Sequence, residues 1–111
     1  MAYNKELSLR IWNCLADVSG VTEKMMFGGV GFLVNGNMAC GVHGENLIVR
    51  LSPADGDKAL KRPHTRPFDL SGKPMRGWVY VEPAGIASEA DLQDWVNQGI
   101  AFARSLPPKK T

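Results

Sequence analysis

The chain has 111 residues, of which 44% are hydrophobic and 22% charged, values typical of one folded, soluble domain. Its net charge of +2 is too small to indicate a nucleic-acid partner by charge alone. No apolar run approaches the ~20 residues that span a bilayer, and the N-terminus lacks a signal-peptide core. We therefore expect no membrane association and no multidomain enzyme, but a single cytoplasmic domain over residues 1–111 with a mobile tail at 106–111.

The residue types that most often carry chemistry are sparse. Cys14 and Cys40 are too few for a disulfide framework and have no zinc or redox spacing, which predicts two buried, reduced thiols. His43 and His64 lie in predicted turns or loops, without a metal-ligand set or a nucleophile motif beside them. The sequence thus predicts no catalytic activity, no metal and no cofactor.

The first predicted element is an amphipathic helix over residues 4–18. Leu7, Ile11 and Leu15 recur at helical spacing and place one apolar stripe along it. Ser19-Gly20 then supplies the backbone freedom with which helices often end.

An antiparallel meander of three strands is predicted between residues 22 and 51. Asn35-Gly36 is the strongest hairpin signal in the chain, because both residue types tolerate the positive φ of a type I′ turn. His43-Gly44-Glu45 marks a second turn. The strands are expected at 30–34, 38–42 and 46–51.

The glycine-rich stretch at 27–31 invites comparison with phosphate-binding loops and with the GxxG loop of KH domains. A phosphate-binding loop leads into a helix, and the KH loop joins two helices, whereas this segment leads into a strand. The favoured interpretation is a bulge or sharp bend in a curved strand.

In the second half, Ser52-Pro53 is the favoured start of a short helix, which Pro63 ends. Ser88 begins a last helix that runs to about Leu106. Pro67 confines the first of the two intervening strands to an edge or a bulge, because proline cannot donate to a strand ladder. These strands are expected at 66–70 and 75–81, with a turn at 71–74.

The predicted order is therefore α-β-β-β-α-β-β-α. Strands joined mainly by hairpins, with helices at their ends, favour an α+β class in which helices pack on a curved antiparallel sheet.

Positive charge is concentrated in residues 58–76. Against Asp69 alone, this segment holds Lys58, Lys61, Arg62, Arg66, Lys73 and Arg76. Basic residues near aromatic ones can form a surface for nucleic acid or an acidic partner. The alternative is that these charges surround a helix and a hairpin turn without converging.

The strand at 75–81 carries large apolar side chains on both faces. Trp78 and Tyr80 share one face, while Val79 and Val81 share the other. Either the helices cover more than one face of the sheet, or one face meets a second subunit or a partner.

Residues 26–38 resemble the N-terminal domain of the TfoX/Sxy family of bacterial competence regulators. The segments 62–64, 72–81, 95–96 and 103–109 resemble a subgroup in which this domain stands alone. The similarity runs from about Leu7 to Lys110 and is carried most specifically by the MFGG segment together with KPMRGWVYV.

This resemblance implies an α+β fold similar to that of type III secretion chaperones. It also implies a link to transcriptional control of DNA uptake, in which full-length members carry a further helical domain and work with the cyclic-AMP receptor protein. The family supplies no catalytic residues.

The sequence thus predicts a small non-enzymatic domain that acts by protein–protein contact as a transcription- or competence-related accessory regulator. The alternative is direct binding of nucleic acid or a small anion by segment 58–76, and a homodimer is a further alternative. Arginine and tryptophan often dominate interfaces. The candidate partner-binding residues are a cationic rim and an aromatic anchor, namely Arg62, Arg66, Lys73, Arg76 and Trp78.

Overall fold

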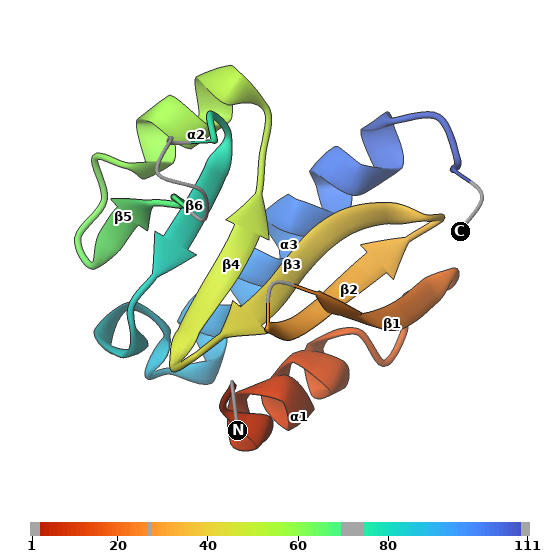
Figure 1. Ribbon diagram of the computed structural model, residues 1–111, viewed down its shortest axis with the longest axis horizontal. Helices are drawn as coiled ribbons and strands as arrows, with labels where there is room; N and C mark the ends of the chain where they lie inside the picture. Colours follow the sequence, from red (N-terminus) through yellow and green to blue (C-terminus); the bar gives the residue numbers. More distant parts are fainter. Residues whose placement is uncertain (1–2, 27, 70–74, 110–111) are drawn as a thin grey trace.

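The computed structural model, which describes residues 3–26, 28–69 and 75–109, confirms the α+β class. Three α-helices and one short 3-10 helix accompany a six-stranded antiparallel sheet. Figure 1 shows α3 running behind the sheet and α1 below it. The elements in chain order are α1 (Lys5–Cys14), β1 (Val21–Met26), β2 (Gly29–Val34), β3 (Asn37–His43), β4 (Asn46–Arg50), α2 (Pro53–Ala59), β5 (Thr65–Pro67), β6 (Trp78–Val81), η1 (Pro83–Ile86) and α3 (Glu89–Ser105).

The strands lie in the order β1-β2-β3-β4-β6-β5. The prediction of three strands before α2 was wrong, because β1 is a fourth. Four consecutive exposed residues at positions 22–25, among them Glu23 and Lys24, remove the alternation of apolar and polar residues by which half-buried strands are recognised.

The glycine-rich stretch is a hairpin turn and not the predicted bend within one strand. Met26 at the end of β1 pairs with Gly29 at the start of β2, so only two residues connect these strands. One of them, Gly28, has a φ of +73°, which glycine adopts without strain. Phe27 lies outside the described residues.

The other turn predictions hold where the structure describes them. Asn35 and Gly36 have φ values of +53° and +84° and join β2 to β3, as a type I′ turn requires. Pro67 lies in β5, an edge strand that pairs only with β6. The predicted turn at 71–74 lies outside the described residues.

Polar side chains cap the start of each α-helix. The side chains of Asn4, Ser52 and Ser88 accept hydrogen bonds from backbone N–H groups in the first turns of α1, α2 and α3, which satisfies donors that a helix start leaves unpaired. α1 is shorter than predicted: it ends at Cys14, and Leu15 packs into the core just beyond it.

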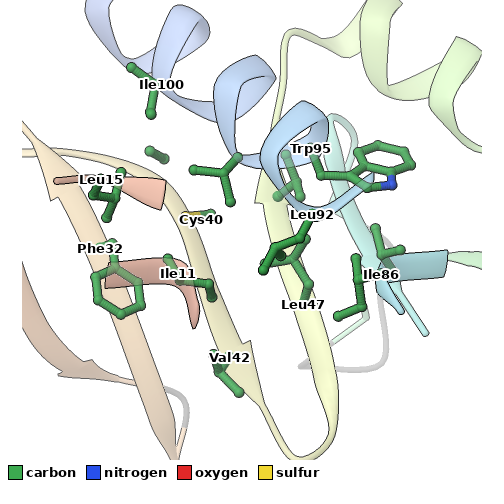
Figure 2. Packing of buried hydrophobic residues seen from close by; sticks show 14 of the residues in the cluster. Ile11, Leu15, Phe32, Cys40, Val42, Leu47, Ile86, Leu92, Trp95 and Ile100 are labelled. Carbon is green, nitrogen blue, oxygen red and sulfur yellow. The ribbon is translucent and has the colours of Figure 1, made fainter. Parts of the chain in front are cut away.

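The main hydrophobic core lies between the helices and one face of the sheet. Figure 2 shows Ile11, Phe32, Leu47 and Leu92 converging from α1, β2, β4 and α3. The buried apolar side chains of all three α-helices belong to this cluster. α3 buries one stripe, which comprises Leu92, Trp95, Val96, Gly99, Ile100 and Ala103.

Both cysteines are free thiols. Cys14 is half-buried, whereas Cys40 is buried in the main core. Burial raises the pKa of the Cys40 thiol to about 12, so this group stays protonated at neutral pH and lacks the thiolate that nucleophilic chemistry needs.

Candidate functional site

A second apolar cluster lies on the face of the sheet opposite the main core. Val79 and Val81 point into the main core, whereas Tyr80 belongs to the second cluster and Trp78 packs against it. The prediction that both faces of this strand carry apolar area is therefore confirmed. We call this side of the sheet the open face, and its cluster comprises Met38, Ile48, Phe68 and Tyr80 with the partly buried Met26, Met75 and Trp78.

Strand register places one row of residues across the whole open face. Directly paired residues on antiparallel strands point to the same side of a sheet. Cations occupy both ends of the row and two glycines lie near its middle. From β1 to β5 the row reads Lys24, Gly31, Gly41, Ile48, Tyr80 and Arg66.

The paired glycines leave a hollow that two methionines cover. A Cβ atom at Gly31 would lie 2.8 Å from the sulfur of Met26 and 2.9 Å from that of Met38. A Cβ atom at Gly41 would lie 2.9 Å from Cε of Met38. The thioether side chains therefore lie over backbone in the middle of the open face. Methionine has three rotatable bonds and repacks easily against different neighbours.

A pocket of about 360 Å³ opens where the open face meets the β2–β3 turn and the end of β4. Its charged lining residues are all basic. Among the residues that the structure describes, no carboxylate pairs with Lys24, Arg50 or Lys109. We call this the basic pocket, and it is lined by Lys24, Met26, Leu33, Gly36, Asn37, Met38, Arg50, Trp78 and Lys109.

Ring contacts hold Arg50 in the basic pocket, and a backbone hydrogen bond fixes the segment that carries Lys109. The guanidinium of Arg50 lies 5.4 Å from the ring centres of both Trp78 and Phe102, within the range of cation–π attraction. The backbone N–H of Lys109 donates to the carbonyl of Asn35 at 2.8 Å. Figure 1 shows this end of the chain beside the β2–β3 turn.

The aromatic rings of the open face pack mainly on one another. Phe68 stacks on Trp78 with ring centres 5.8 Å apart and meets Tyr80 edge-on at 4.9 Å. A hydrogen bond of 2.7 Å joins the Tyr80 hydroxyl to Nδ1 of His43, and burial raises the pKa of Tyr80 above its ordinary value. These packed rings lie beside the basic pocket, because Trp78 both packs against this cluster and lines the pocket.

The arginines of the predicted cationic rim pair with different carboxylates, and they do not all lie on the same side of the sheet. Arg62 pairs with Asp94 of α3 at 3.3 Å and lies 3.9 Å above the Trp95 ring, on the side of the main core. Arg66 lies over Tyr80 on the open face and pairs with Glu82 at 3.1 Å. The structure thus places Arg62 and Arg66 against rings on opposite sides of the sheet.

Arg76 pairs with Asp57 of α2 at 2.7 Å. This hydrogen bond lowers the pKa of the Asp57 carboxyl and raises that of Arg76. Of the predicted residues that the structure describes, Trp78 alone lines the basic pocket. Lys73 lies outside the described residues.

Sequence reasoning missed Lys24, Arg50 and Lys109. They come from β1, the end of β4 and the segment after α3, so no local charge run marks them. The signal that points to Lys24 is strand register, and it requires β1 to be recognised first.

The residues that the structure describes contain no group of three or more His, Cys, Asp or Glu side chains placed to hold a metal ion. None of their helices is both long and apolar enough to cross a bilayer.

Comparison with known proteins identifies the family. The family model described as the TfoX N-terminal domain matches residues 13–103, nearly the whole chain. Neither the curated proteins nor the solved structures gave a match. The chain therefore belongs to the TfoX N-terminal domain family, a family of regulatory domains linked to competence and not known for catalysis.

Proposed function

We propose that this protein is a non-catalytic accessory regulator of transcription that works by holding a partner protein on its open face. The observation that carries the proposal is the second apolar cluster, built on the side of the sheet away from all three α-helices. Met38, Ile48, Phe68 and Tyr80 are buried at its centre, whereas Met26, Met75 and Trp78 are partly exposed around them. Exposed apolar side chains gathered on one face commonly mark an interaction surface.

Residue chemistry on the open face favours a protein partner. Trp78 is half-buried beside Met26, Met38 and Met75, and interfaces are enriched in tryptophan, methionine and arginine. The unbranched methionines adapt to a partner's shape. The family link to competence regulation directs the search for that partner to the transcription machinery.

Nucleic acid remains the second candidate but has weaker support. Single-stranded nucleic acid binds through aromatic faces on which bases stack, combined with a basic groove. Here Phe68, Trp78 and Tyr80 pack on one another, and the described arginines of segment 58–76 pair with carboxylates. A mobility shift that disappears steeply as salt rises would favour this candidate instead.

The test is a binding assay with purified RNA polymerase and purified cyclic-AMP receptor protein. We expect one of them to bind the chain, and Trp78→Ala to weaken that binding by about tenfold or more, as expected for an interface anchor.

Trp12→Ala is the matched control. Trp12 is 37% exposed and meets the edge of Phe32 on the main-core side. This variant also loses a partly exposed tryptophan but should bind normally. Both variants are first checked for an intact fold by circular dichroism. Absence of binding to either protein, or equal losses in the two variants, contradicts the proposal.

A further inference from the structure

We propose that the basic pocket binds a short acidic segment of the partner protein, in which carboxylate side chains alternate with apolar ones. This inference rests on the proposed function and names the chemistry that the open face recognises. It is carried by three cations that converge on an apolar hollow.

Charge complementarity favours an acidic ligand for the basic pocket. The described chain forms four ion pairs, and each uses a cation other than Lys24, Arg50 and Lys109. Within the described residues, the arginines of the basic segment are therefore paired internally, whereas the pocket cations have no carboxylate partner. Carboxylates supplied from outside would form charge-assisted hydrogen bonds there.

Apolar side chains near these charges favour a peptide over a free inorganic anion. Met26, Leu33, Met38 and Trp78 line the same pocket. A free inorganic anion would gain nothing from these side chains, whereas an apolar residue of a peptide would bury against them. The methionines over Gly31 can move aside to admit such a residue.

The size and position of the basic pocket favour a short segment of a larger partner. Its volume of about 360 Å³ lies at the small end of the range for ligand sites, so it holds a few side chains and not a folded domain. Trp78 belongs both to the pocket and to the edge of the apolar cluster. A chain seated in the pocket therefore continues onto the open face, where the rest of the partner would lie.

The experiment uses fluorescein-labelled peptides and fluorescence anisotropy. The probe peptide alternates three Glu with three Leu residues. One comparison peptide carries Gln for every Glu, and a second carries Ser for every Leu. We expect the Glu-Leu peptide to bind at least about tenfold more tightly than either, because charge and apolar contact each contribute.

Charge reversal tests the site itself. Lys24→Glu and Arg50→Glu should each lower the affinity for the Glu-Leu peptide by about fivefold to tenfold, the range expected for loss of a charge-assisted contact. The matched controls are Lys58→Glu in α2 and Arg104→Glu in α3, two exposed positions outside the pocket. They change net charge equally and should leave affinity within about twofold, since exposed distant charges are screened. If Arg50→Glu does not fold, Lys24→Gln and Arg50→Gln replace the reversals.

Several results would overturn the inference. They are no binding of the Glu-Leu peptide, equally tight binding of the Gln or the Ser peptide, or an equal loss of peptide affinity in Lys58→Glu and Lys24→Glu. Displacement of the peptide by inorganic phosphate at the same concentration as by unlabelled peptide would mark a small-anion site instead.

The inference and the proposed function fail separately. If a transcription protein binds in a Trp78-dependent way but ignores Lys24→Glu and Arg50→Glu, the function stands and the pocket assignment falls. If the peptide binds the pocket but neither transcription protein binds the chain, the pocket assignment stands and the proposed partner class falls.

Discussion

Trp95→Ala is expected to lower the free energy of unfolding by about 3–5 kcal/mol, the usual cost of removing a fully buried tryptophan. Trp95 is 1% exposed and lies, like Ile86, at one end of the core cluster in Figure 2. The guanidinium of Arg62 covers its ring from outside at 3.9 Å. Truncation therefore leaves a cavity that the packed helix and sheet cannot close. Thermal melting should show a midpoint at least about 10 °C lower.

Trp12→Ala serves as the comparison for this loss, because Trp12 makes an edge contact with Phe32 from a partly exposed position. It should cost about 1 kcal/mol, the centre of the distribution for point mutants. Similar melting temperatures for the two variants would contradict the placement of Trp95 in the core.

Gly99→Ala is expected to destabilise the protein by about 1–3 kcal/mol, the usual cost of overpacking a core. In an isolated helix the same change would stabilise by about 1 kcal/mol, since alanine is the better helix former. Here a Cβ atom at Gly99 would collide with the backbone carbonyl oxygen of Ala39 in β3. α3 must therefore move away from the sheet to accept any side chain at this position.

Ala101→Gly in the same helix is the matched control. Ala101 is exposed, so only helix propensity acts, and the expected loss is about 1 kcal/mol. Both variants are measured by urea denaturation. A gain in stability for Gly99→Ala would show that α3 does not lie as close to β3 as the structure places it.

Elements with strong local signals were predicted well from the sequence. The Asn35-Gly36 hairpin follows from the φ preferences of two adjacent residues, and the start of α2 follows from Ser52-Pro53. β1 was missed because it is an edge strand, whose exposed residues need not alternate between apolar and polar. Without β1, the glycine pair that follows it could not be recognised as a hairpin turn.

The candidate site was predicted only in part, and the reason is physical. Trp78 was identified because the strand alternates: Val79 and Val81 fill one face, so Trp78 and Tyr80 must lie on the other. The local run of positive charge did not reveal that Asp57, Glu82 and Asp94 pair with the arginines. Ion pairing between distant segments depends on the fold, so charge counted along the sequence overstates the charge available to a partner.

The most direct test of the open face as the docking surface is an NMR titration with methionine methyl groups labelled with ¹³C. Met26, Met38 and Met75 lie on the open face, whereas Met25 is 63% exposed on the opposite side of β1, where it pairs with Val30 of the main core. On addition of the transcription protein that binds the chain, we predict that the three open-face signals shift or broaden while Met25 stays unchanged. Perturbation of Met25 without the other three would contradict the account.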